Sequence, residues 1–320
     1  MCDQDFGTDI PVLVVFGPTA SGKTALSSRL FLSGLSGFPS GRVEIISADS
    51  MQVYRRMDIG TAKPDPQFLQ LLPHHLLDIC EPDQQFCAGD FVRLADTACK
   101  DIYSRGKLPV ILGGTAFYIQ NFIYGLPDTP VSDPAERSLL KERAEKEGLS
   151  ILYRELLAAD PVSASIIHPN DGYRIIRALE VFLSSGRPRS SFRLPFHYRS
   201  PYRFFVISLD RPREELYRRI DLRVLGMMEA GLRTEFEALR REGFTSSDPG
   251  MQAIGYREFF DAENGNAGID TIVARIQQDS RKYAKRQETY IRSLPDIHHM
   301  DADDFDTILA AVRSFYTTVF

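Results

Sequence analysis

The sequence predicts an α/β protein in which a parallel sheet, flanked by helices, carries a helical insertion. Through the first 127 residues, short apolar runs alternate with segments of helical spacing, a rhythm typical of a parallel sheet wrapped in helices. Between residues 128 and 203 this rhythm gives way to charged helical segments, and another apolar run follows. We therefore predict an α/β core formed by residues 1–127 and 204–320, with a helical insertion at residues 128–203.

Five apolar runs predict the strands of the core in chain order. Residues 11–16 predict a buried strand because the run is continuously apolar and ends at Gly17. Similar short runs predict strands at residues 43–48, 75–79, 108–112 and 204–209.

The insertion and the C-terminal third are predicted to be helical. Leucines recur at helical spacing between residues 134 and 159, and residues 169–171 supply a start signal for a helix at residues 173–183. From Pro212 onward the pattern is again mostly helical, with breaks expected at Gly226, Gly231, Gly243 and Gly255.

Composition and net charge indicate a globular protein whose surface is not positively charged overall. Hydrophobic residues make up 43% and charged residues 25% of the chain, and the net charge is −5. Binding of nucleic acid would therefore need a concentrated positive patch. The four cysteines form no zinc-binding C-x-x-C pair. The N-terminus lacks the basic residues of a targeting segment and no apolar run is long enough to cross a membrane, so we expect a cytoplasmic protein, taken to be a monomer.

A phosphate-binding loop follows the first predicted strand. Residues 17–24 match G-x-x-x-x-G-K-[ST] and precede a helix expected to begin near Lys23. In such a loop the backbone N–H groups surround phosphate oxygens, Lys23 adds charge, and the Thr24 hydroxyl can ligate Mg²⁺. The fold is therefore expected to be P-loop NTPase-like. The residues expected to bind phosphate are Gly17, Pro18, Thr19, Ala20, Ser21, Gly22, Lys23 and Thr24.

The loop alone does not define the reaction, since P-loops serve hydrolysis, phosphoryl transfer and other chemistry. Further segments stand in order between about Val12 and Arg292. They read ISADSMQVY (46–54), DIGTAKP (58–64), PHHLLDI (73–79), GGT (113–115), NDGYRIIRALE (170–180), AIGYR (253–257) and YAKRQ (283–287). Together with the P-loop, these segments resemble the tRNA dimethylallyltransferases over nearly the whole chain.

The resemblance implies an unusual use of the P-loop. The loop is expected to hold the diphosphate of dimethylallyl diphosphate, whose prenyl group is transferred to the exocyclic N6 of the adenine on the 3′ side of the anticodon. This amine is a poor nucleophile because its lone pair is delocalised, so a base that takes its proton would help. By resemblance, Asp49 is that base, Thr115 contacts the acceptor base, and Arg223 binds the diphosphate together with Lys23 and Mg²⁺.

The resemblance also implies a set of residues that contact tRNA. Two departures from common family patterns are Tyr173, where glutamine is frequent, and a C-terminal motif without tryptophan. A zinc finger, which eukaryotic relatives often append, is not encoded after Arg292, which favours a bacterial-type enzyme. The residues expected to contact tRNA are Asp49, Ser50, Met51, Gln52, Thr115, Arg137, Tyr173, Arg174, Arg177, Gln252, Gly255, Tyr256 and Arg257.

A basic and aromatic segment offers a binding surface for RNA. No acidic residue occurs between Glu180 and Asp210, and a second basic cluster lies at residues 281–286. Arginines and aromatic rings together suit an unstacked, single-stranded loop, although such a run can also be a solvated surface. The residues of the first segment are Arg187, Arg189, Arg193, Arg199 and Arg203, interleaved with Phe192, Phe196, His197, Tyr198 and Tyr202.

Three other functions compete with this hypothesis. A free-nucleotide isopentenyltransferase would use AMP or ATP as acceptor, but it would need neither the helical insertion nor the basic C-terminal helix. A P-loop kinase or ATPase would transfer or hydrolyse a phosphoryl group without an allylic diphosphate. A non-catalytic RNA-binding protein would tolerate the loss of Lys23, which is present.

Overall fold

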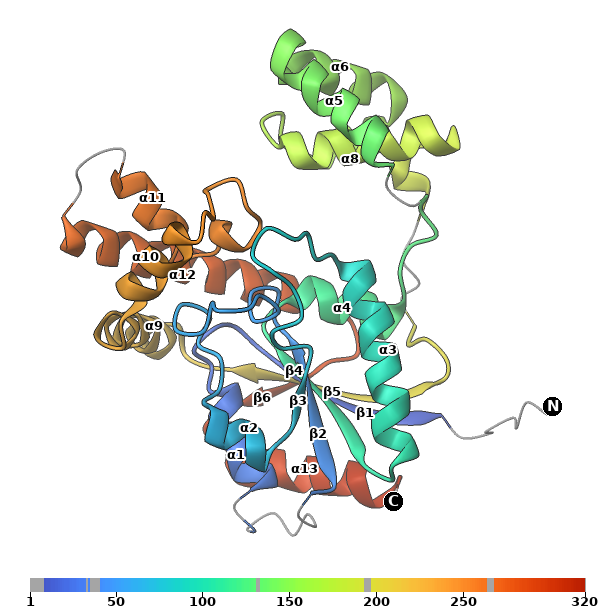
Figure 1. Ribbon diagram of the computed structural model, residues 1–320. Coiled ribbons are helices and arrows are strands. Elements are labelled where there is room, and N and C mark those ends of the chain that lie inside the picture. The colour runs from blue at the N-terminus through green and yellow to red at the C-terminus, as the bar shows by residue number, and fades with distance from the viewer. Residues whose placement is uncertain are drawn as a thin grey trace. The chain divides into compact units, whose positions relative to one another are not determined.

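The structure is a computed structural model that describes residues 9–32, 34, 41–130, 133–192, 197–263 and 268–319 (Figure 1). The chain divides into two compact units, Met1–Ile123 with Tyr198–Phe320, and Tyr124–His197. The insertion predicted at residues 128–203 overlaps the second unit, and its last two residues, Tyr202 and Arg203, begin a strand of the first unit.

The described part of the first unit is built on a six-stranded sheet whose neighbouring strands are all parallel. Its strand order is β3-β2-β4-β1-β5-β6, which places the P-loop strand β1 between β4 and β5. The strands are β1 (Ile10–Phe16), β2 (Val43–Ala48), β3 (His74–His75), β4 (Leu108–Gly113), β5 (Tyr202–Asp210) and β6 (His298–Asp301).

Four predicted strands are confirmed, and two differences have physical causes. The strand predicted at residues 75–79 is only the two-residue β3, because Leu76 and Asp78 adopt φ values of 64° and 53°, which end an extended strand. Strand β6 was not predicted because its residues are polar and mostly exposed, so they form no apolar run.

Helices cover both faces of this sheet. Side chains of α1 and α13 join those of β1, β2, β4 and β5 in one hydrophobic cluster, and α3 packs against β1, β2 and β4. The predicted α/β fold with a parallel sheet is confirmed. The helices of this unit are α1 (Lys23–Phe31), α2 (Pro66–Leu71), α3 (Ala88–Ser104), α4 (Ala116–Tyr124), α9 (Arg213–Glu229), α10 (Leu232–Arg241), α11 (Arg257–Glu263), α12 (Ile269–Ile291) and α13 (Phe305–Thr317), with the short η2 (Gly250–Gln252).

The described part of the second unit is helical, and it contains α5 (Pro134–Glu147), α6 (Leu149–Ala159), α7 (Pro161–Ile166), α8 (Gly172–Ser185) and η1 (Arg189–Ser191). The helical segment at residues 134–159 divides at Gly148, whose φ of 90° suits glycine. The predicted start signal of α8 is confirmed, since the Asp171 side chain accepts the Arg174 N–H. No described helix is long and apolar enough to span a bilayer.

Candidate active site

The P-loop joins β1 to α1 at the carboxyl edge of the sheet. Gly22, with φ 105°, directly precedes the first residue of α1, Lys23. Two arginines that follow β5 in the sequence donate hydrogen bonds to backbone carbonyls of the loop. Arg219 of α9 donates to the Ala20 oxygen at 2.9 Å and Arg211 donates to the Ser21 oxygen at 3.3 Å. These two hydrogen bonds from arginine side chains help to hold the backbone of the loop in shape.

Lys23 folds back onto the loop that carries it. Its Nζ donates to the carbonyl oxygens of Gly17 at 3.0 Å and Pro18 at 2.8 Å. Burial and the nearby Arg223 lower the pKa of Lys23 to about 7, while Asp49 acts in the opposite direction. The lysine is thus poorly solvated and would gain from a bound anion.

Arg223 of α9 is the second cation of the site. Burial lowers the pKa of its guanidinium, and Asp49 opposes this shift. Arg223 forms no ion pair with any residue that the structure describes, although most arginines near it do. Two desolvated cations facing a single carboxylate form a natural site for an anion.

A groove gives access to Arg223. Its walls come from the segment after β2 and from α9, and Glu235 of α10 holds that segment in place. The Glu235 carboxylate accepts the backbone N–H groups of Asp58 and Ile59, each at 2.8 Å, and of Gly60 at 3.1 Å. The lining residues are Asp58, Ile59, Ala62, Lys63, Pro64, Asp65, Pro66, Leu69, Asp78, Arg223, Gly226, Met227 and Ala230.

Asp49 and Thr115 meet because their strands are neighbours. Asp49 follows β2 and Thr115 follows β4 closely, with Ala48 paired to Gly113 in register. The Thr115 Oγ1 accepts the Ser50 N–H at 2.9 Å. Asp49 caps its own turn through Oδ1, which accepts the N–H groups of Met51 at 2.9 Å and Gln52 at 3.3 Å. Described residues make no hydrogen bond to its Oδ2, which leaves this oxygen for a substrate.

Two site residues on α12 were not assigned from the sequence, although they lie in the YAKRQ segment. Burial and the charge of the nearby Asp49 raise the pKa of Tyr283 to about 12, while Thr115 acts in the opposite direction. Gln287 contacts both the P-loop and the turn before Thr115. The resemblance of the YAKRQ segment to the family was the available signal. The segment itself gave no indication that Tyr283 and Gln287 point into the site and not into solvent.

The other residues of the first unit that were expected to contact tRNA are mostly engaged within the protein. The Gln52 amide accepts from Ser47 and donates to the carbonyls of Thr61 and Ala62. Arg257 pairs with Glu258 and with Asp279 of α12. Gln252 is exposed.

Tyr256 is fully buried, next to Gly255 with its φ of 103°. Its hydroxyl donates to Glu235, and a Cβ at Gly60 would lie 2.4 Å from its ring. Contact between Tyr256 and RNA would therefore require a change in this packing.

In the second unit, the predicted arginines share a buried carboxylate. Arg137 and Arg177 both pair with Glu180, at 3.3 Å and 3.2 Å, and Glu180 is fully buried. Tyr173 is 73% exposed, beneath the Arg137 guanidinium. Arg174 is exposed and pairs only locally, with Asp171. Tyr173 and Arg174 are thus accessible on α8, while Arg137 and Arg177 are held beside them.

The predicted run of arginines requires correction. Arg199 is only 19% exposed, because its guanidinium is bound to Asp96 of α3 and donates to the Phe122 carbonyl. Arg203 donates to Thr318. Arg187 lies over the Phe192 ring. Arg193 and Phe196 lie outside the described residues. The structure therefore contradicts a basic surface that includes Arg199, whose role is to tie α3 to the chain before β5.

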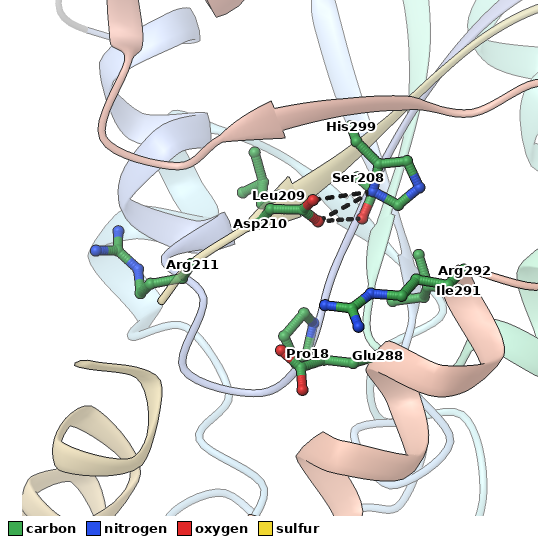
Figure 2. A pocket seen from close by; sticks show the side chains of 9 residues that line it. All are labelled: Pro18, Ser208, Leu209, Asp210, Arg211, Glu288, Ile291, Arg292 and His299. Carbon is green, nitrogen blue, oxygen red and sulfur yellow. Dashed lines mark hydrogen bonds and ion pairs between the residues drawn. The ribbon is translucent and has the colours of Figure 1, made fainter. Parts of the chain in front are cut away.

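A small cavity lies between the P-loop residue Pro18, the end of β5 and the end of α12 (Figure 2). His299 of β6 contacts Asp210 of β5 at 3.0 Å and so joins two neighbouring strands. The described residues contain no cluster of His, Cys, Asp and Glu that could hold a metal ion. The lining residues are Pro18, Ser208, Leu209, Asp210, Arg211, Glu288, Ile291, Arg292 and His299.

Thr24 fits the magnesium role expected of it. It is the second residue of α1 and is exposed, and no described residue forms a hydrogen bond to its hydroxyl. Mg²⁺ binds few protein ligands and keeps water and substrate phosphate oxygens. One hydroxyl beside a phosphate-binding loop, with no carboxylate cage, matches that preference.

Comparisons with known proteins agree with this geometry. A family model described as IPP transferase matches residues 52–294. The chain is 43% identical to tRNA dimethylallyltransferase 1 of Syntrophotalea carbinolica, over 95% of this chain and 96% of the relative. It is 45% identical to tRNA dimethylallyltransferase 2 of Geotalea uraniireducens, over 96% and 97% of the two chains.

Solved structures give the same result. The crystal structure of the full-length tRNA isopentenylpyrophosphate transferase from Bacillus halodurans is similar at a TM-score of 0.67 and 35% identity, covering 97% of this chain and 96% of that one. A eukaryotic dimethylallyltransferase acting on tRNA is similar at a TM-score of 0.73 and 27% identity, covering 95% and 77%.

Proposed function

The chain belongs to the IPP transferase family, whose relatives are tRNA dimethylallyltransferases, and we propose that it transfers a dimethylallyl group from dimethylallyl diphosphate to tRNA. The acceptor is the exocyclic N6 of the adenine on the 3′ side of the anticodon. The observation that supports the proposal is the electrostatic interaction of two poorly solvated cations, Lys23 and Arg223, with Asp49, whose Oδ2 accepts no hydrogen bond from a described residue.

The cations serve the leaving group. As the bond between the allylic carbon and the diphosphate oxygen breaks, negative charge grows on the diphosphate. Burial lowers the pKa of both Lys23 and Arg223, so a growing negative charge beside them stabilises their charged forms and is stabilised in return. A Mg²⁺ ion held by the Thr24 hydroxyl would supply further electrostatic stabilisation of the diphosphate.

The opposite side of the site serves the acceptor amine. A bond forms between N6 and the allylic carbon, and N6 must lose one proton. Asp49 is supported as the base by its free Oδ2, while its Oδ1 is held by the N–H groups of Met51 and Gln52. The proposal gives Thr115 the role of orienting the acceptor adenine, and its hydrogen bond with the Ser50 N–H supports that role.

The tRNA is recognised through groups on both units. On α8, the exposed Tyr173 offers a ring for stacking and Arg174 offers charge for phosphate. Arg137 and Arg177 support that surface through Glu180. The remaining predicted contacts, from Asp49 to Gln52 and from Gln252 to Arg257, stay part of the proposal, which also holds that the enzyme is a cytoplasmic monomer.

The direct test is a transfer assay with purified protein, Mg²⁺ and labelled dimethylallyl diphosphate, offering unmodified tRNA and AMP in parallel. Label in tRNA alone supports the proposal. Label in AMP would assign the chain to free-nucleotide prenylation. Consumption of ATP with no label in either acceptor would show phosphoryl chemistry and overturn the proposal.

A further inference from the structure

Gln287 connects two loops that are far apart in the sequence. It lies on α12 and is only 4% exposed. Its Oε1 accepts the N–H of Thr19 in the P-loop at 2.9 Å, and its Nε2 donates to the carbonyl of Gly114 at 2.6 Å. Thr19 belongs to the side of the site that would hold diphosphate, and Gly114 immediately precedes Thr115 on the acceptor side.

The chemistry of these two partners fixes the orientation of the amide. A backbone N–H can only donate and a backbone carbonyl can only accept, so the Gln287 side chain satisfies both in a single rotamer. A glutamate would keep the bond to Thr19 but place a second oxygen against the Gly114 carbonyl. Because these groups are buried, losing either bond leaves an unsatisfied polar atom.

The contact at Gly114 is also tight in space. A Cβ built on Gly114 would lie 2.7 Å from the Gln287 Nε2, closer than such atoms approach. Gly114 does not have a positive φ, so its backbone accepts alanine. An alanine there would displace the end of the Gln287 side chain while leaving residue 287 itself unchanged.

We propose that Gln287 is a positioning residue that couples occupancy of the P-loop to the turn carrying Thr115, so that diphosphate and tRNA bind cooperatively. The inference rests on the proposed function. An incoming anion draws Lys23 away from the carbonyls of Gly17 and Pro18, and Thr19 follows Pro18 directly. The Thr19–Gln287–Gly114 bridge carries this change to Thr115, whose Oγ1 fixes Ser50 beside Asp49.

The test measures the Kd of unmodified tRNA with and without magnesium pyrophosphate. In the wild-type protein we expect pyrophosphate to tighten tRNA binding by about fivefold or more, the lower end of ordinary coupling between sites. The coupling factor is the ratio of the tRNA Kd without pyrophosphate to the Kd with it. In Gln287→Glu and Gly114→Ala this factor should fall close to one, while tRNA and pyrophosphate should each still bind alone. Gln277→Leu is the matched control, since Gln277 lies on the same helix and donates to the Asp221 carbonyl, away from the P-loop.

Two results would overturn the coupling: a wild-type factor of one, or an unchanged factor in both Gln287→Glu and Gly114→Ala. Because the two variants disturb the bridge from opposite sides, a folding defect in one leaves the other informative. Transfer of labelled prenyl groups to tRNA by the wild-type protein is measured in the same preparation. Its absence would refute the proposed function, whereas transfer without coupling would refute only the role of Gln287.

Discussion

Replacing Arg223 with methionine should move stability and ligand affinity in opposite directions. Arg223 is half-buried on α9, where it lines the groove, and it forms no ion pair with any described residue. Its charge also lowers the pKa of Lys23, which shows that the two cations repel each other. Methionine keeps the apolar stem and removes the charge. The unliganded protein therefore loses an unfavourable interaction, while the diphosphate loses a desolvated partner.

The expected changes in stability and in affinity follow from the desolvation of Arg223 and from its lack of an ion-pair partner among the described residues. Removing a buried charge that is poorly compensated is neutral or stabilising, here by up to about 1 kcal/mol, which corresponds to a rise in Tm of about 2 °C. Truncating one partner of a buried charge contact weakens binding by about 2 to 4 kcal/mol, or about 30- to 1000-fold in Kd.

The assay pairs thermal unfolding with calorimetric titration of magnesium pyrophosphate. Arg218→Met on the same helix is the control, since Arg218 is exposed and pairs only with Glu215, and it should change neither quantity. A Tm that falls by several degrees while the pyrophosphate affinity stays intact would show that Arg223 is a packing residue. That outcome would refute its assignment to the leaving group.

Three further predictions concern the other groups of the site and the corrected arginine. Asp49→Asn keeps an oxygen to cap the turn but removes the base, so turnover should fall by about 100-fold or more while tRNA affinity is retained; near-normal turnover would exclude Asp49 as the base. Because the pKa of Lys23 is about 7, the unliganded protein loses the charge of Lys23 as the pH rises through 7. Above this pH, Lys23 must take up a proton when pyrophosphate binds. Affinity for magnesium pyrophosphate should fall by up to about tenfold per pH unit above that point, and equal pH profiles for the wild type and Lys23→Met would contradict it. Arg199→Ala should destabilise the protein by about 2 kcal/mol in urea because Asp96 loses the Arg199 guanidinium and keeps the Tyr202 hydroxyl, whereas Arg189→Ala should not; equal unfolding midpoints would contradict the structural role of Arg199.

The sequence predicted those parts of the fold and site that depend on local pattern. Continuous apolar runs located β1, β2, β4 and β5, and the P-loop motif followed directly from residue types between a strand and a helix. Asp49 and Thr115 could be expected near each other because both follow strands, and parallel strands end at one edge of the sheet. The pairing of β2 with β4, which brings them together, is visible only in the structure.

Charge patterning along the chain could not reveal which arginines are free. Arg199 stands in a segment without acidic residues, and its partner Asp96 lies 103 positions earlier in the chain. The segment therefore looked like an RNA-binding surface, although one of its cations holds α3 in place. The burial of Tyr256 was equally invisible in the local pattern, since its hydroxyl partner Glu235 comes from α10. The number of charged side chains in a segment can be counted from the sequence, but their partners in distant segments cannot be identified from it.

Helix α12 shows why the central part of the site was the hardest to predict. Asp279, Tyr283 and Gln287 follow one another at four-residue spacing, so they lie on one face of the helix. By pattern alone, a stripe of polar residues indicates the solvent-exposed side of an amphipathic helix. Here each of these residues instead reaches an element of the site: Asp279 binds Arg257, Tyr283 lies beside Thr115 and Asp49, and Gln287 joins Thr19 to Gly114. At Gln287 the stripe faces inward because Thr19 and Gly114, in two loops at the carboxyl edge of the sheet, present backbone groups that an apolar side chain could not satisfy, and this makes α12 the element that joins these two loops.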